Sequence, residues 1–459
     1  MSEPAAPERP RGVLVPLALA QFICSFAGTN MAVMITDISD DLNADVGGVQ
    51  TVITLFLLIM AALMIPGGKL TDRYGRKRCF TVGLSVYGVG AVLSALAPGL
   101  GVLALGNSVL EGVGTALLIP PVYILTTLLF TDTASRAKAF GVVMAMGGIG
   151  AAAGPLLGGL IASGLGWRAA FAFQALVVAA ILISTRRVRD PIPADPSRKL
   201  DLLGTGLSAA GLVLLVLGIL AADNDLRWSA VLIVLAVLVL AGFFLHVRDT
   251  ERAGGDPLVS MSLFRDKVSN IGLVTQLLQW LILMGTSFVV SAYLQVVRGY
   301  DPIGTGVIFT AATAGLLVSS LSAARLARRF DQRTLIMSGF GVVLVGTVVL
   351  IVLAGSTLNP WAFAPGLLLI GLGLGSMLTP SVNVVQSAFG ADQQGEISGL
   401  SRCVSNLGSS LGTAIAGTIL VAGLSSHGYA FAMLTLALAG ALGLFAAAEL
   451  PTGKPLAQR

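Results

Sequence analysis

"KLTDRYGRKRCFTVG", residues Lys69–Gly83, returns in altered form as "RLARRFDQRTLIMSG" at Arg325–Gly339. Four residues of the first copy have an identical or similar residue 256 positions later in the sequence. They are Leu70, Arg73, Tyr74 and Gly83. A second pair of segments, "GAAAGPLLGG" from Gly150 and "GSSLGTAIAG" from Gly408, is 258 places apart. Two pairs with nearly the same spacing indicate that the chain contains two related halves.

The composition predicts a membrane protein. Apolar residues make up 55% of the 459-residue chain, and charged residues only 11%, whereas soluble proteins carry about 25% charged residues. Apolar runs of about 20 residues, long enough to cross a bilayer as helices, recur along the whole chain. The net charge of +5 comes from loops beside these runs and does not indicate a nucleic-acid partner. Three distant cysteines predict neither a disulfide framework nor a metal site.

We count fourteen apolar spans, so both chain ends are expected on one side. Basic residues concentrate in four loops of that side: Lys69, Arg73, Arg76, Lys77 and Arg78; Arg186, Arg187, Arg189, Arg198 and Lys199; Arg248, Arg252, Arg265 and Lys267; and Arg325, Arg328, Arg329 and Arg333. The loop after the first span is acidic instead, with Asp37, Asp40, Asp41 and Asp45. The positive-inside rule then predicts that both termini are cytoplasmic.

The repeat also predicts the domain organisation. Residues 1–190 form an N-terminal six-helix bundle, residues 268–459 form its copy, and residues 191–267 hold an inserted helix pair with its flanking loops. Two related bundles are typical of alternating access, with a binding site between them near the bilayer midplane.

The loop "GKLTDRYGRKR" (Gly68–Arg78) joins the second and third spans. Its glycines allow a tight turn, and its cations can meet helix C-terminal carbonyls and anionic lipid. The basic count alone predicts only a cytoplasmic loop, but the order G-x-L-x-D-R-x-G-R-K resembles the signature loop of the major facilitator superfamily. The resemblance implies a conformational latch made by Gly68, Asp72, Arg73, Gly75 and Arg76.

The segment "GIGAAAGPLLGGLIASGLGWRAAF" (Gly148–Phe171) covers the fifth span and the following turn. Its small residues favour close helix packing. The pattern G-x-x-x-G-P-x-x-G-G is also similar to the motif of the drug:proton antiporters within the superfamily, where it acts as a hinge and a dry seal. The resemblance assigns that role to Gly150, Gly154, Pro155, Gly158 and Gly159.

Further stretches resemble the fourteen-helix branch, the EmrB/QacA-like exporters: "KLDLLGTGL" (Lys199–Leu207), "DPLVSMSLFRDK" (Asp256–Lys267), "YLQVVRGYDPIGTG" (Tyr293–Gly306) and "GEISGLSRCVSNLGSSLGTAIAG" (Gly395–Gly417). The resemblance implies an all-α major facilitator fold, with two extra helices between two six-helix bundles. It implies a non-enzymatic, proton-coupled exporter of hydrophobic or amphipathic, preferentially cationic, small molecules. We expect a monomer in the bacterial cytoplasmic (inner) membrane, with lipid and a small-molecule substrate as partners and no cofactor or metal besides the proton gradient.

The chain departs from this branch at two positions that usually carry charge. The usual acidic residue of the first span is Ala27, although Thr29 is retained, and the usual Arg of the fourth span is Ser108. Glu111 replaces the usual Gln of that same span. The chain therefore lacks both charged partners of its relatives and carries a new acid nearby.

Glu111 lies in "GNSVLEGVGTALLIPP" (Gly106–Pro121), the middle of the fourth span. A carboxylate at this depth is costly, and acids in such positions are functional by default. Burial favours the neutral carboxyl, so Glu111 would be protonated in the empty protein and would lose its proton to a cationic substrate. We therefore predict that Glu111 is the proton-coupling site. The structural alternative is a permanently neutral carboxyl that is hydrogen-bonded to Asn107 or Asn30.

Other polar residues in the spans are weaker candidates for substrate contact, because each could equally join helices by hydrogen bonds. They are Gln21, Thr29, Asn30, Asn107, Gln276, Gln279, Trp280, Tyr293, Asn383, Gln386 and Asn406. Arg402 is expected to be an interfacial cation whose charged end reaches water.

Several functions remain open from the sequence. The transporter could export one dedicated lipid, metabolite or siderophore, or it could be a facilitator without proton coupling, which the loss of the first-span acid favours. A membrane-embedded enzyme would need a cluster of His, Asp, Glu or Cys residues that the sequence does not suggest. A passive channel is disfavoured by the repeat and by the latch loop.

Overall fold

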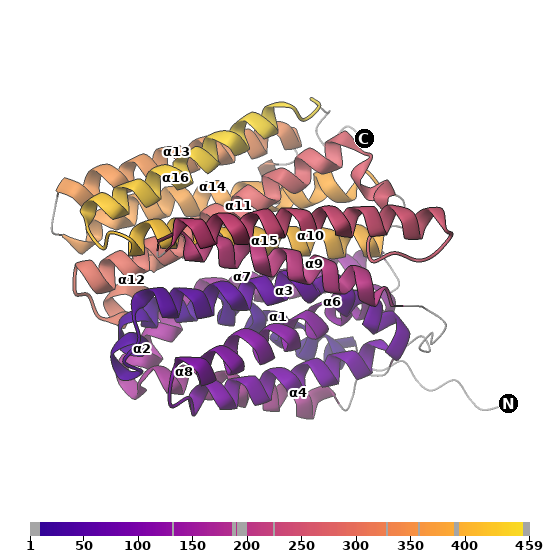
Figure 1. Ribbon diagram of the computed structural model, residues 1–459, viewed down its shortest axis with the longest axis horizontal. Coiled ribbons are helices and arrows are strands. Elements are labelled where there is room, and N and C mark those ends of the chain that lie inside the picture. Colours follow the sequence, from indigo (N-terminus) through magenta and orange to yellow (C-terminus); the bar gives the residue numbers. More distant parts are fainter. Residues whose placement is uncertain are drawn as a thin grey trace.

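The computed structural model describes residues 10–130, 133–185, 190, 200–223, 225–326, 329–356, 359–389 and 394–452. Its long helices lie side by side along roughly one direction (Figure 1). Thirteen helices in the described ranges are long and apolar enough to span a membrane. A further long helix, α7 (Thr133–Leu165), has 33 residues and contains a shorter apolar stretch, Ala153–Leu165. The predicted all-α fold is confirmed, with thirteen spanning helices in the described ranges and α7 as the candidate for the fourteenth span.

The first bundle contains the six spans before the inserted pair. The first span is continuous through α1 (Pro10–Asn30), η1 (Met31–Met34) and α2 (Ile35–Asp41). The others are α3 (Val46–Tyr74); α4 (Arg76–Ala95); the joined α5 (Leu100–Leu103), η2 (Ala104–Glu111) and α6 (Gly112–Leu129); α7; and α8 (Trp167–Ser184).

The inserted pair is α9 (Leu202–Leu220) and α10 (Leu226–Arg252), with the short η4 (Ala221–Asp223) between them. A single turn, η5 (Met261–Phe264), precedes the second bundle. That bundle contains α11 (Lys267–Ala292) with η6 (Tyr293–Val297), α12 (Pro302–Leu326), α13 (Gln332–Ser356), η7 (Pro360–Phe363), α14 (Ala364–Gln386), α15 (Gln394–Val421) and α16 (Ser426–Ala448).

Helix starts follow from short polar side chains that satisfy the first free backbone N–H groups. Such N-caps open several membrane helices, namely α3 with Asp45, α9 with Asp201, α10 with Asp225, α11 with Asp266 and α16 with Ser425. Gly75 ends α3 and begins α4 at φ 95°, a conformation that other residues rarely adopt. We call the end of the molecule at Gly75 the basic end. The opposite end, with the loop from Asp37 to Asp45, is the acidic end.

The repeat seen in the sequence is also present in the helix packing. In the first bundle α7 packs along α1, and in the second α15 packs along α11. A Cβ added at Gly150 of α7 would collide with the Phe22 carbonyl oxygen of α1. A Cβ at Gly408 of α15 would collide in the same way with the Leu277 carbonyl oxygen of α11. The paired glycine motifs therefore have one structural cause, close approach of the first and fifth helices of each bundle.

The two bundles meet along two helix pairs, α3 with α15 and α7 with α12. The inserted helices pack on each other, and α9 also contacts α3 and α15. In Figure 1, α9 and α10 pass in front of the region where the first bundle, in indigo to magenta, meets the second bundle, in orange and yellow. The predicted division into residues 1–190, 191–267 and 268–459 stays a prediction.

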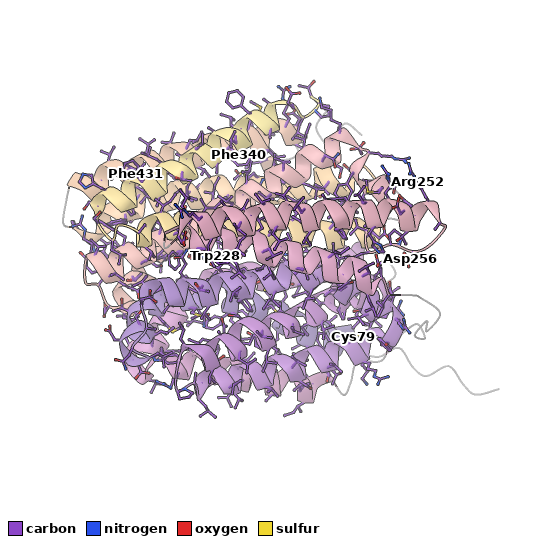
Figure 2. The ribbon with its side chains drawn as sticks, in the orientation of Figure 1. Cys79, Trp228, Arg252, Asp256, Phe340 and Phe431 are labelled. Carbon is purple, nitrogen blue, oxygen red and sulfur yellow. The ribbon has the colours of Figure 1, made fainter. Side chains whose placement is uncertain are left out.

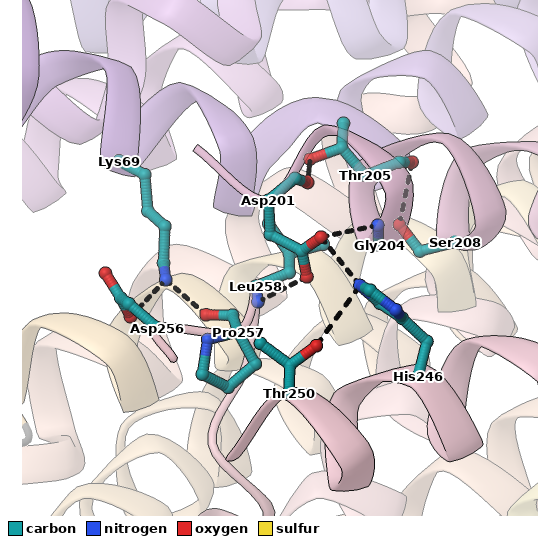
Figure 3. Close-up of polar contacts among 10 residues, drawn as sticks. All are labelled: Lys69, Asp201, Gly204, Thr205, Ser208, His246, Thr250, Asp256, Pro257 and Leu258. Carbon is teal, nitrogen blue, oxygen red and sulfur yellow. Dashed lines mark hydrogen bonds and ion pairs between the residues drawn. The ribbon is translucent and has the colours of Figure 1, made fainter. Parts of the chain in front are cut away.

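Asp201 joins the inserted pair to the following loop at the basic end (Figure 3). It accepts hydrogen bonds from the backbone N–H of Gly204 (2.7 Å) and of Leu258 (3.1 Å), and its carboxylate lies 2.8 Å from His246 Nε2 of α10. Burial acts to raise the pKa of Asp201, but the Gly204 N–H, His246 and the Leu258 N–H together outweigh burial and hold this pKa below its usual value. The ionised carboxylate thus fixes the start of α9 against α10.

Beside this junction, Lys69 at the basic end of α3 reaches the same loop. Its Nζ lies 2.8 Å from Asp256 Oδ1 and also donates to the Pro257 carbonyl oxygen (Figure 3). The first bundle is therefore tied to the segment that leads from the inserted pair into the second bundle.

Some basic residues that predicted the orientation lie outside the described residues, namely Arg186, Arg187, Arg189, Arg198, Lys199 and Arg328, and so does the side chain of Arg325. The orientation of the termini stays a prediction.

Candidate functional site

Glu111 is fully buried at the end of η2, a π-helical segment in the middle of the fourth span. Ser94 Oγ of α4 donates to Glu111 Oε1 at 3.3 Å, and Asn107 Nδ2 donates to Oε2 at 3.4 Å. The Tyr87 hydroxyl, which donates to Gln174 of α8, lies next to this carboxyl. π-Helical turns are rare and are frequently found at functional sites. The acid therefore sits in a polar cluster between the fourth, third and sixth spans.

These contacts bear on the two interpretations of Glu111. The bond to Asn107, which the structural alternative requires, is present. Asn30 is 1% exposed, and within the described residues both its amide atoms lack a hydrogen-bond partner. It does not bond Glu111. The donors around Glu111 serve an ionised carboxylate as well as a neutral one, so they are compatible with a group that changes its protonation state.

The close packing of α7 on α1 includes a bond that compensates a proline. Pro155 has no N–H, so the carbonyl of Ala151, four residues earlier, loses its helical partner. Thr29 Oγ1 of α1 donates to this Ala151 oxygen at 3.1 Å. A Cβ at Gly154 would collide with the same hydroxyl, so the glycine gives Thr29 access to the carbonyl. Thr29 thus joins two helices by a hydrogen bond, which is the alternative that the sequence left open, and only the identity of its acceptor was not predicted.

We expect Thr29→Val to lower stability by about 0.6–2 kcal/mol, because a bond between membrane helices has about that worth. Thr29→Ser keeps the hydroxyl and serves as the control. In the Pro155→Ala background the Ala151 carbonyl regains a helical N–H, so Thr29→Val should cost clearly less there. Unfolding of the four proteins in mixed micelles measures this cycle. Equal losses in both backgrounds would refute the assignment.

The remaining glycines of the predicted hinge also face neighbouring helices. A Cβ at Gly158 would lie 3.1 Å from Asn30 Cβ, and one at Gly159 would lie 2.5 Å from the Pro302 carbonyl oxygen of α12. Reciprocally, a Cβ at Gly306 of α12 would lie 2.5 Å from the Pro155 carbonyl oxygen of α7. Each helix thus places a glycine against the carbonyl of the other's proline, and the two bundles touch there. That this contact moves during transport stays a prediction.

Other contacts between the bundles lie toward the acidic end. Gln50 Nε2 of α3 donates to the carbonyl oxygens of Thr413 (3.0 Å) and Ala414 (3.1 Å) on α15. Gln295 Nε2 of η6 donates to the Ala32 carbonyl oxygen at 3.0 Å. The sequence analysis did not single out either glutamine, because the sequence around a Gln near the end of a span does not show which distant residue it will contact. These contacts join the bundles in their acidic half.

A further contact between the bundles corrects the prediction for Arg402. Its Nη2 donates to the Tyr123 hydroxyl of α6, and its guanidinium carbon lies 5.0 Å from that ring's centre. Tyr123 in turn donates to Gln21 Oε1 of α1 at 3.1 Å. Arg402 is therefore a half-buried bridge between the bundles and not a cation that reaches out to water.

Two polar candidates of the second bundle, Gln276 and Gln279, are buried about one turn apart on α11. Gln279 Nε2 of α11 donates to Ser381 of α14, and Ser401 Oγ of α15 donates to Gln276 Oε1 at 2.6 Å. Within the described residues, Gln276 Nε2, Gln279 Oε1 and Asn406 Nδ2 are buried without a hydrogen-bond partner. Such atoms are rare in folded proteins and need an explanation, which a bound polar group would supply.

The last four candidates of the second bundle lie on α11, η6 and α14. Trp280 is half-buried against the apolar core. Asn383 and Gln386 are half-buried near the basic end of α14, where Gln386 donates to Ser398 at 3.2 Å. Tyr293 is buried in an aromatic cluster near the acidic end, 4.4 Å from the ring of Tyr429. Packing accounts for Tyr293.

The predicted latch residues form a compact turn at the basic end. Arg76 pairs with Asp72 one helical turn earlier, at 3.1 Å. The backbone N–H groups of Arg76 (2.6 Å) and Lys77 (3.3 Å) donate to the Asp190 carboxylate, which thereby caps the start of α4. Asp190 follows α8, and sequence reasoning missed it. The remaining latch residues flank this turn on α3: Gly68 lies close to Pro120 of α6, and the Arg73 guanidinium lies 5.4 Å from the centre of the Tyr74 ring.

Comparisons with known proteins agree with this architecture. The family model described as Major Facilitator Superfamily matches residues 17–413. The chain is 33% identical to the puromycin resistance protein pur8 of Streptomyces alboniger, over 92% of this chain and 84% of the relative. It is 29% identical to a probable actinorhodin transporter of Streptomyces coelicolor, over 87% and 70%. It is 28% identical to the multidrug efflux pump LfrA of Mycolicibacterium smegmatis, over 91% and 82%.

Proposed function

Because the chain belongs to the major facilitator superfamily, we propose that it is a secondary active exporter that exchanges protons for hydrophobic or amphipathic, preferentially cationic, small molecules. The relatives named for puromycin resistance and for multidrug efflux support export of such compounds. The basic end is proposed to face the cytoplasm, following the positive-inside rule.

One observation carries the proton coupling: the Glu111 carboxyl is completely buried in a membrane-spanning helix, among hydroxyl and amide donors and with no cation bonded to it in the described residues. A buried acid without a cation favours the neutral form, and an arriving cationic substrate favours the ionised form. Substrate and proton therefore compete for one negative charge, which is the basis of antiport.

The contacts between the bundles suggest how this competition couples to alternating access. In the described state, Gln50, Gln295 and the Gly159 and Gly306 contacts hold the acidic half together. Release of substrate on that side requires these contacts to part, and we propose that contacts such as that of Arg402 with Tyr123 then tighten toward the basic end. The proposed polar contacts of the substrate are the amide atoms that have no partner among the described residues: both atoms of Asn30, and Gln276 Nε2, Gln279 Oε1 and Asn406 Nδ2.

The test is a flux measurement in proteoliposomes with an imposed pH gradient. For each proton exchanged, one pH unit supplies about 1.4 kcal/mol, enough for about tenfold accumulation of substrate. Puromycin is one compound to include, because a relative is named for resistance to it. Substrate that accumulates and then drains when a protonophore is added supports antiport. Equal concentrations on both sides at every pH gradient would instead identify a facilitator. Accumulation of one compound from a broad panel would favour a dedicated exporter.

A further inference from the structure

A cavity of about 280 Å³ lies at the basic end, between the last turns of α10 and η5. Three cations, one carboxylate and two apolar side chains line it: Arg248, Arg252, Arg265, Glu251, Met261 and Phe264. Cavities that bind small ligands begin at about 300 Å³, so the space suits a headgroup rather than a bulky drug.

Three arginines and one carboxylate line this cavity, so it carries a net positive charge within the described residues. Arg248 meets only Asp249, at 3.8 Å and with both side chains more than half exposed. Arg252 and Arg265 have no ion pair with any described residue. The Glu251 carboxylate accepts a hydrogen bond from the Ser260 hydroxyl at 2.8 Å and forms no ion pair with these arginines. Arginines without a carboxylate partner favour a phosphate group, because the planar guanidinium can donate two parallel hydrogen bonds to two phosphate oxygens.

The lipid-facing surface of α10 leads directly into the cavity. A row of exposed side chains follows the helix at alternating spacings of four and three residues: Val234, Leu238, Ala241, Leu245, Arg248 and Arg252. This spacing places them on one helix face. Leu238 is 63% exposed and Leu245 is 53% exposed, and only 17% of the apolar part of α10 is buried. Figure 2 labels Arg252 at the basic end of this helix.

We propose that the cavity binds the phosphate headgroup of an anionic phospholipid whose acyl chain lies along the exposed row of α10. A free phosphate ion shares the chemistry of the headgroup, but it has no acyl chain to contact the apolar row that ends at Arg248 and Arg252. Because η5 precedes α11, a lipid held here would bridge the inserted pair to the second bundle. The inserted helices would then stabilise the transporter only when the lipid is bound. This role is separate from the proposed exchange of substrate and protons.

The test compares the full-length protein in nanodiscs of phosphatidylcholine with and without phosphatidylglycerol. The probe variant is Arg248→Gln with Arg252→Gln, and a charge-matched control is Lys267→Gln with Arg333→Gln, which lie at the same end outside the cavity. Native mass spectrometry counts retained phosphatidylglycerol, and thermal unfolding measures stabilisation by bound ligand.

We expect the wild type and the control to retain one more phosphatidylglycerol than the probe variant, and to unfold at a higher temperature as its fraction rises. The probe variant should unfold at the same temperature in both bilayers. Equal lipid retention in probe and control would overturn the proposal. So would stabilisation of the wild type by inorganic phosphate in phosphatidylcholine alone, because it would identify a free-ion site. A probe variant too unstable to purify is replaced by Arg265→Gln, to which the same outcomes apply.

Discussion

Glu111→Gln should abolish proton-driven accumulation of substrate while leaving the protein folded. Gln has nearly the same shape as a neutral Glu. Ser94 and Asn107 donate to different carboxyl oxygens of Glu111, so the one amide oxygen of Gln can keep the bond from Asn107 while its NH2 group donates to the Ser94 hydroxyl oxygen. It cannot release a proton, so a pH gradient has no means of driving substrate movement through this site. The wild type should concentrate substrate about tenfold per pH unit for each proton exchanged. With the variant, the substrate concentrations on the two sides of the membrane should stay nearly equal.

The matched controls change the surroundings of Glu111 and leave its carboxyl in place. Ser94→Ala and Asn107→Leu each remove one donor. They should shift the pH at which transport is half-maximal without abolishing accumulation, because the donors favour the ionised form. Glu111→Asp, which keeps an acid on a shorter stem, should retain part of the coupling.

The structural alternative predicts a different pattern. If Glu111 only holds α4 against the fourth span as a neutral carboxyl, then Glu111→Gln should accumulate substrate like the wild type. Asn107→Leu should then lower stability about as much as loss of Glu111 does. Wild-type accumulation by Glu111→Gln across a range of pH gradients would therefore end the proposal that this residue couples protons.

The sequence could predict the fold because its signals are periodic. Apolar runs of fixed length, a repeat spaced by about 256 residues and loops of alternating charge all follow from the chain alone. It could also predict the contact of Glu111 with Asn107, because the two lie four residues apart on one helix. The partner Ser94 could not be predicted, since it depends on which helices become neighbours.

The error at Arg402 has a similar physical cause. The apolar run suggested that the thirteenth span begins near this arginine, so water seemed to be within reach of its side chain. The helix begins at Gln394, which puts Arg402 about 12 Å along its axis. A cation at that depth needs a partner, and Tyr123 of the other bundle supplies one. Helix boundaries are the least certain part of sequence reasoning, and this small error changed the role of the residue.

The second large effect is expected at the reciprocal contact of α7 and α12. Gly159→Ala and Gly306→Ala each place a Cβ about 2.5 Å from a backbone carbonyl of the other bundle, a gap that only movement of the helices can widen. Such overpacking costs about 1–3 kcal/mol, which corresponds to about 5- to 150-fold in an equilibrium. The close contacts lie between the bundles and not within either one, so the cost falls on the state that is closed at the acidic end.

We therefore expect both variants to open toward the acidic end and to transport at least about fivefold more slowly than wild type. Labelling of a Thr418→Cys reporter by a membrane-impermeant maleimide measures the opening, because Thr418 lies 9% exposed beside Gln50 in that half. The protein without the reporter gives the background from Cys24, Cys79 and Cys403. Gly148→Ala is the control, since nothing lies within 4 Å of its added Cβ.

The double variant tests whether the two glycines act through one contact. If one alanine already separates α7 from α12, the second alanine adds little further strain. The fold-loss in transport rate of the double variant should then be smaller than the product of the fold-losses of the two single variants. Independent effects would multiply. Rates and reporter labelling that match the Gly148→Ala control would show that the contact does not need to close during transport, and that the glycine pattern serves packing alone.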